Sequence, residues 1–182
     1  AKTGRYSFTG LPHRIEELER LGARFRLSKA PAWFGEDIAA SGEEPMTTDF
    51  EAVMPSAFLR TEGGYVPDPL ADDQSLYIRT DQGLVILLGC AHRGVVNIVR
   101  HARELMGTER VHMIVGGTHL HPASSEQLER TIAALKDLEV QWLGVSHCTG
   151  MKASARLAAV FAERFFFNNA GTVIRFPFRP AE

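Results

Sequence analysis

The chain has 182 residues, which is enough for one ordinary domain and too few for two. Its hydrophobic content of 45% and charged content of 23% are typical of a globular protein, and a formal net charge of -2 gives no general attraction for nucleic acid or an anionic membrane. No apolar run approaches the roughly 20 residues that span a bilayer, and two cysteines are too few for a disulfide framework, so we expect a cytoplasmic protein.

The first 74 residues are predicted to be mostly irregular. Residues 13–21 place apolar side chains on one helical face and precede Gly22, which predicts a short amphipathic helix. Residues 24–27 alternate between polar and apolar, which predicts a strand. Residues 41–69 are rich in Gly, Pro, Glu and Asp, and we expect them to form a long covering or mobile loop.

Regular structure is predicted from residue 75 onward. Residues 75–80 and 84–89 are apolar runs joined by a turn at Gly83, which predicts a hairpin. A unit of strand, polar loop and amphipathic helix then occurs three times, starting at residues 84, 111 and 140. This alternation predicts an α/β fold with a mostly parallel sheet. Residues 171–178 are predicted to form a last strand, and residues 1–182 are treated as one domain.

Each of the three strand-to-helix loops contains histidine. These are His92 in the first loop, His119 and His121 in the second, and His147 in the third. Loops that follow parallel strands open onto one edge of the sheet, so we expect these side chains to converge. Imidazole binds Zn, Fe or Mn, and a catalytic metal commonly takes about three protein ligands. The pattern predicts a metal site that includes His92, His147 and His119.

A single histidine at a strand end is more often a hydrogen-bonded structural residue, and only the recurrence favours a metal site. The remaining histidines, at positions 13, 101 and 112, are expected to be structural. Cys90 is either a thiolate ligand or a small buried residue, and the sequence leaves both open. Cys148 is expected to point away from a site into which His147 points.

Several motifs resemble, in their order, the C-terminal part of metallo-β-lactamase-fold proteins. They are SGEEPMTTDFE, DDQSLYI, GLVILLGCAHRGVVNIV, VGGTHLH, SHCTG and FFFNNAGTVIRF. They are most similar to the group of 7,8-dihydropterin-6-methyl-4-(β-D-ribofuranosyl)-aminobenzene-5′-phosphate synthase-like proteins. The resemblance implies an αββα sandwich with a metal site at the edge of two facing sheets. It implies one or two ions, usually zinc and in some members iron or manganese.

The same resemblance implies an activity and assigns residues to it. A metal-activated water would attack an ester, amide or phosphate-type small molecule, or the protein would have the pterin-linked synthase activity. His92 and His147 would be ligands, and Cys90 occupies the place of a bridging aspartate in many members. His119 would be a ligand or a substrate contact. Gly117, Thr118 and His121 are expected to contact the substrate. The position of His121, two residues after His119, also favours a role in supporting a ligand or capping the loop.

The superfamily motif HxHxDH does not occur in this chain. In the family it precedes everything found here, so we expect an incomplete sandwich. A longer natural protein is the favoured explanation, and a truncated gene or a second chain are the others. An exposed inner sheet face would drive homo-oligomerisation or association with the missing half. The alternative function is a non-catalytic metallo-β-lactamase-like binding domain or one half of a split protein.

Overall fold

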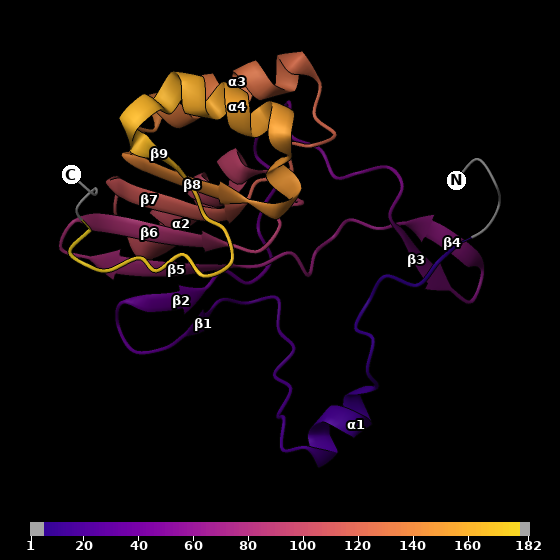
Figure 1. Cartoon of the computed structure of the whole chain (residues 1–182). Coiled ribbons are helices and arrows are strands. Elements are labelled where there is room, and N and C mark those ends of the chain that lie inside the picture. Colours follow the sequence, from indigo (N-terminus) through magenta and orange to yellow (C-terminus); the bar gives the residue numbers. More distant parts are fainter. Residues whose placement is uncertain (1–5, 179–182) are drawn as a thin grey trace.

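A seven-stranded mixed sheet forms the centre of the computed structural model, which describes residues 6–178 (Figure 1). The strands, in spatial order, are β1 (Ala32–Trp33), β2 (Ile38–Ala40), β5 (Ser75–Thr80), β6 (Gly83–Leu88), β7 (Val111–Gly117), β8 (Trp142–Ser146) and β9 (Phe165–Phe167). Neighbours from β1 to β6 are antiparallel, and neighbours from β6 to β9 are parallel. The predicted hairpin and the mostly parallel second half are therefore both present.

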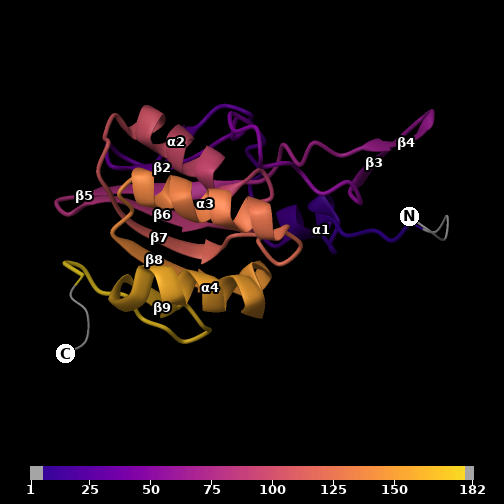
Figure 2. The ribbon, with the colours of Figure 1, turned by 90° about the horizontal axis from the view of Figure 1, so that it is seen from above.

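Three helices cover one face of this sheet. They are α2 (Val95–Met106), α3 (Ser125–Asp137) and α4 (Met151–Phe161), and they lie in a row when seen from above (Figure 2). Each follows one of the strands β6, β7 and β8, as the repeated unit predicts. Gly107 ends α2 in the left-handed conformation, and the Ser124 hydroxyl accepts a hydrogen bond from the Gln127 amide at the start of α3. The main core, including Ile86, Ile114 and Leu143, lies between the sheet and these helices.

The opposite face of the sheet is covered by the C-terminal segment. Ile174 and Phe178 pack over a cluster that contains Val85, Met113 and Val115. The Gln82 side chain holds this segment by accepting from the Phe178 amide at 2.6 Å and donating to its carbonyl at 3.3 Å. The prediction of a strand at 171–178 is wrong, because this segment crosses the sheet face and pairs with no strand among the described residues.

The α/β class is confirmed, and residues 6–178 contain one helix layer on one large mixed sheet. A complete αββα sandwich would need a second large sheet and a second helix layer. The described part of the chain holds neither, in agreement with the expectation of an incomplete sandwich. None of the helices described is long and apolar enough to cross a membrane.

The N-terminal region extends away from the sheet. Helix α1 (Ile15–Arg20) forms inside the predicted range but buries none of its residues. Residues 24–27 are irregular and exposed and pair with no strand among the described residues, so the predicted strand there is wrong. The strands β1 and β2, and the hairpin of β3 (Phe58–Thr61) and β4 (Gly64–Pro67), were not predicted. Figure 1 shows α1 and the β3–β4 hairpin apart from the body of the molecule.

Candidate metal centre

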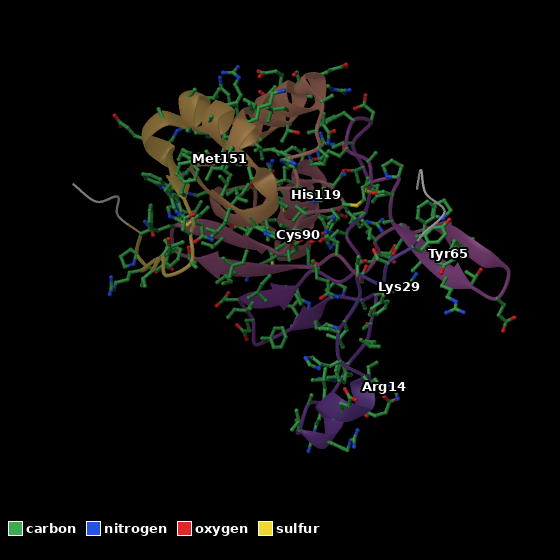
Figure 3. The ribbon with its side chains drawn as sticks, turned by 45° about the vertical axis from the view of Figure 1, so that its right-hand side comes forward. Arg14, Lys29, Tyr65, Cys90, His119 and Met151 are labelled. Carbon is green, nitrogen blue, oxygen red and sulfur yellow. The ribbon has the colours of Figure 1, made fainter. Side chains whose placement is uncertain are left out.

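Three loops that follow β6, β7 and β8 meet at one edge of the sheet. They carry His92, His119 and His147, as the parallel order of the strands predicts. The imidazole rings of His92 and His119 have their centroids 4.2 Å apart. Figure 3 shows Cys90 and His119 near each other at this edge, far from Tyr65 on the projecting hairpin. The sheet thus brings together side chains that lie far apart in the chain.

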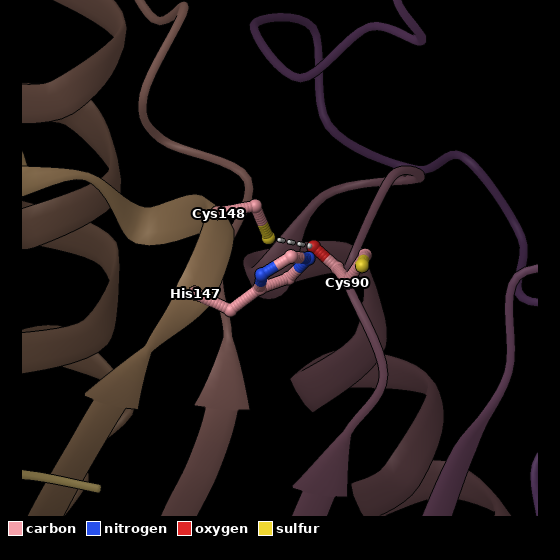
Figure 4. A group of neighbouring side chains, drawn as sticks. All are labelled: Cys90, His147 and Cys148. Atoms are coloured by element: carbon pink, nitrogen blue, oxygen red, sulfur yellow. Dashed lines mark hydrogen bonds between the residues drawn. The ribbon is translucent and has the colours of Figure 1, made fainter. Parts of the chain in front are cut away.

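A second group at the same edge contains two thiols and an imidazole. The possible ligand atoms of Cys90, His147 and Cys148 all lie within 4.8 Å of one another (Figure 4). The Cys148 thiol donates a hydrogen bond to the Cys90 carbonyl at 3.3 Å, and the His119 amide donates to the Cys148 sulfur at 3.3 Å. The four predicted ligands are therefore divided between a His92–His119 pair and this thiol-containing group.

The expectation that Cys148 points away from the site is wrong. It assumed the alternation of a β-strand, in which neighbouring side chains face opposite sides. Residues His147–Thr149 instead form a 3₁₀ turn, in which successive side chains are separated by about a third of a turn. His147 has a φ of 50°, and this conformation lets His147 and Cys148 face the same edge.

Several imidazole nitrogens at this edge have no hydrogen-bond partner. Among residues 6–178, no partner is found for the buried Nδ1 of His92 or for either buried ring nitrogen of His119. Buried polar atoms in proteins are normally paired, so these nitrogens are available to bind an ion. Burial, followed by the charges of His92, His147 and His121, lowers the pKa of His119 and favours its neutral, metal-binding form. Nitrogen and sulfur donors in this combination fit Zn²⁺.

Each of the three loops also contains one non-glycine residue in the left-handed region. The φ angles are 55° at Ala91, 49° at His119 and 50° at His147. Such a conformation costs about 1–3 kcal/mol per residue and persists only where the surrounding structure enforces it. Its recurrence in the same three loops indicates that the surrounding fold fixes the positions of these side chains.

Hydrogen bonds tie the loops to one another and to the body. Thr118 is buried and donates from its amide and its hydroxyl to the Thr149 hydroxyl oxygen, at 3.2 and 3.0 Å. Asp73 accepts a hydrogen bond from the Arg93 amide at 2.9 Å and so holds the loop that carries His92. Burial raises the pKa of Asp73, and its hydrogen bonds oppose that rise. Sequence reasoning missed Asp73, because it is 20 residues from its partner.

The residues assigned to substrate contact lie beside this edge. His121 is exposed, and its amide donates to the Cys148 carbonyl at 3.1 Å. Gly117 is buried, and a Cβ there would lie 2.6 Å from the Cys148 sulfur. The hydroxyl of Thr118 is already used by Thr149. Substrate contact by these three residues stays a prediction, and the observed roles of Gly117 and Thr118 concern the spacing of the loops.

The acidic segment 41–51 is ordered and docked beside the site. Glu51 accepts hydrogen bonds from the amides of Val96 and Asn97, at 2.9 and 2.8 Å, at the start of α2. The Asn97 side chain in turn accepts from the amides of Thr47 and Thr48. No local signal in the sequence points to Glu51, because 46 residues separate it from Asn97.

No family model matches the chain. The chain is 35% identical over 164 residues to 7,8-dihydropterin-6-methyl-4-(β-D-ribofuranosyl)-aminobenzene-5′-phosphate synthase of Methanocaldococcus jannaschii, covering 88% of this chain and 56% of the relative. It is 26% identical over 167 residues to the uncharacterized protein MJ0448 of the same organism, covering 92% and 60%. The chain thus spans little more than half the length of these relatives.

The crystal structure of Tm1679, a metal-dependent hydrolase of the β-lactamase superfamily, superimposes with a TM-score of 0.72 at 28% sequence identity. The superposition covers 82% of this chain and 57% of that one. The fold, the order of the motifs and the sequence identity all point to the same superfamily. The chain belongs to the metallo-β-lactamase superfamily.

Proposed function

We propose that this chain carries the metal-binding edge of a metal-dependent hydrolase. The observation that carries the proposal is the meeting of Cys90, His147 and Cys148 within 4.8 Å. Beside them, the His92 Nδ1 and both ring nitrogens of His119 have no hydrogen-bond partner among residues 6–178. Zinc is the first choice of ion for these donors, with iron or manganese as alternatives. His92, His119, His147 and Cys90 are the proposed ligands, and Cys148 joins them as a fifth candidate.

A divalent cation bound at this edge would lower the pKa of a water molecule and polarise the scissile bond of the substrate. The chain's own residues hold and orient the donors: Thr118 and Thr149 fix two of the loops, and Asp73 fixes the third. His147 and His121 are exposed, so a small molecule can reach the edge from solvent. The proposed substrate class is an ester, amide or phosphate compound. The name of the curated relative extends it to a pterin-linked phosphate compound.

We further propose that the site is completed by a polypeptide equivalent to the part of the relatives that this chain does not span. Two facts support this: the motif HxHxDH is absent from the chain, and the chain covers 56% of the first relative. Among the described residues, no carboxylate belongs to the group of possible ligands. The isolated chain is accordingly expected to bind metal weakly, with less than the full complement.

Metal analysis of alanine variants tests the proposed ligands. Each chain is dialysed to equilibrium against a fixed zinc concentration, and the zinc bound in excess of the buffer is measured by elemental mass spectrometry. His92→Ala and His147→Ala should each retain much less zinc than the parent chain. His13→Ala is the matched control, because His13 is exposed and precedes α1, away from the site. Full zinc content in both site variants would refute the proposal.

A second candidate function is non-catalytic binding by the same fold. Two observations favour it: HxHxDH is absent from the sequence, and the group of possible ligands within residues 6–178 contains no carboxylate. The two candidates differ in turnover when zinc-loaded protein is combined with the polypeptide proposed to complete the site. Hydrolysis of bis(p-nitrophenyl) phosphate or p-nitrophenyl acetate, lost in His147→Ala, supports the hydrolase. Tight zinc binding with no turnover of either compound supports the binding domain.

A further inference from the structure

The two cysteines of this chain come from different loops and meet at the candidate metal centre. Both are free and half-buried, and 58 residues separate them in sequence. Their sulfur atoms lie within 4.8 Å of each other, and the Cys148 thiol is already directed at the Cys90 carbonyl (Figure 4). We propose that Cys90 and Cys148 form a reversible intramolecular disulfide, so that oxidation and metal binding compete for the same two sulfurs.

Gly117 provides the space in which these cysteines approach each other. A Cβ at this residue would lie 2.6 Å from the Cys148 sulfur and 3.4 Å from the Cys90 Cα. Any side chain at residue 117 would therefore fill the region between the two cysteines. The absence of a side chain there lets the end of β7 lie directly against both loops without separating their thiols.

Only a modest movement is needed to form the bond. A disulfide has a sulfur–sulfur distance of about 2.05 Å, so the two atoms must approach by at most about 3 Å. The Cys90 side chain can supply part of this by rotating about its Cα–Cβ bond to another staggered position. Cys90 follows Gly89, which is exposed, so the loop is open to solvent on that side. A small oxidant can reach the half-buried thiols from there.

The oxidant is hydrogen peroxide, a two-electron oxidant. Two S–H bonds and the peroxide O–O bond break, and one S–S bond forms. The two thiols lose two electrons and two protons in total, and the peroxide takes them up to leave as two water molecules. A small dithiol such as dithiothreitol reverses the step by thiol–disulfide exchange.

Formation of the disulfide would also change the metal site, an effect that rests on the proposed function. A sulfur in a disulfide is no longer a thiolate ligand, so oxidation removes Cys90 and Cys148 from the donor set. The histidines alone would then hold the ion. Bound zinc should conversely protect both thiols, since zinc-bound sulfur is not free to attack its neighbour.

Peptide mapping of the metal-free chain after peroxide treatment tests the disulfide. Free thiols are blocked with N-ethylmaleimide, the protein is digested without reduction, and peptides are identified by mass spectrometry. We expect a peptide pair joined through Cys90 and Cys148, which disappears on reduction with dithiothreitol. Cys148→Ser should instead accumulate oxygen adducts on Cys90. Oxygen adducts on both cysteines of the parent without a cross-link, or a disulfide between two chains, would overturn the proposal.

The competition is tested on zinc-loaded protein. We expect zinc to slow the cross-link at least tenfold, and peroxide to release zinc that dithiothreitol then allows to rebind. Equal rates of cross-linking with zinc still bound would contradict the competition. A chain that binds no zinc at all would refute the proposed function, while the cross-link in metal-free protein is measured independently of it.

Discussion

His119 combines two unusual features at a single residue. Its backbone is left-handed, with a φ of 49°, and both of its buried ring nitrogens lack a partner among residues 6–178. Each feature is costly for folding by itself. Their coincidence supports the proposed role of His119 as a metal ligand.

His119→Asn separates these two features. Asparagine tolerates the left-handed conformation, so the free energy of unfolding should change by no more than about 1 kcal/mol. Zinc affinity should fall on the order of tenfold or more, since even residues that merely support a ligand have effects of that size. Chemical unfolding and zinc titration measure the two quantities. An asparagine variant with unchanged zinc affinity would remove His119 from the ligand set.

Glu44 is a fully buried carboxyl group beside β5. Tyr77 donates to one of its oxygens at 3.3 Å, and the other oxygen has no hydrogen-bond partner in the described part of the chain. Burial is the main cause that raises the pKa of Glu44, to about 7. A raised pKa in the folded state means that the fold prefers the protonated form. The contribution of Glu44 to the free energy of unfolding is therefore complete below pH 4.5 and is lost as the pH rises through 7.

Glu44→Gln should remove this dependence on pH. In the parent chain, the carboxyl group should lower the free energy of unfolding by about 3 kcal/mol between pH 4.5 and pH 8. The variant should be more stable than the parent at pH 8, as measured by urea unfolding. Glu62→Gln, at an exposed position, is the control and should follow the parent. If the free energies of unfolding of the parent and of Glu44→Gln changed in parallel with pH, the pKa of Glu44 would be the same in the folded and the unfolded chain, which would contradict the prediction.

At the scale of elements, helix α2 is capped by a residue from a distant segment. Gly94 precedes the helix and supplies no side chain, so the amides of Val96 and Asn97 are satisfied by Glu51. A carboxylate at this end also interacts favourably with the helix dipole. Gly94 is required for this contact, because a Cβ there would lie 2.4 Å from a Glu51 oxygen.

Glu51→Ala should destabilise the chain by about 2 kcal/mol, since it removes the cap and leaves two buried amides unpaired. Hydrogen exchange at Val96 and Asn97 should accelerate more than exchange in α3. Glu51→Gln is the control that keeps one acceptor oxygen, and it should lose less stability. Equal protection of these two amides in parent and Glu51→Ala would contradict the capping role.

The regular elements were predictable where the pattern is local. The three strand–loop–helix units and the hairpin of β5 and β6 follow from hydrophobic periodicity and from residues such as Ser124 and Gly107. The strands β1 and β2 were missed because they are short. The segment at 171–178 was predicted as a strand, but it pairs with no strand among residues 6–178. A strand exists only with a partner, and periodicity does not supply one.

At the scale of the whole molecule, apolar side chains remain unpartnered along the N-terminal region. Leu21 and Leu27 are 85% and 83% exposed, and α1 buries nothing. Tyr6 stacks on Tyr65 with ring centroids 3.7 Å apart, so the region contacts the β3–β4 hairpin while leaving most of its own apolar side chains in solvent. Such a surface is typical of a segment that packs against another polypeptide.

The isolated chain should therefore self-associate. Light scattering after size exclusion should give a mass above that of one chain, increasing with concentration. Leu21→Lys combined with Leu27→Lys should shift the distribution toward the monomer, since it removes exposed apolar area without touching the sheet. A monodisperse monomer for the unmodified chain would contradict the expected association.

The amino-acid sequence alone was sufficient to predict the α/β class, the three loops at the sheet edge and the histidines within them. These follow from local periodicity and from the rule that loops after parallel strands share one edge. Tertiary contacts were needed to show that Cys148 lies beside Cys90, that Glu51 caps α2, and that residues 171–178 cover the sheet. Each of these depends on contacts between residues distant in the chain, and on backbone conformations such as that of His147, which are set by packing and not by neighbouring residues.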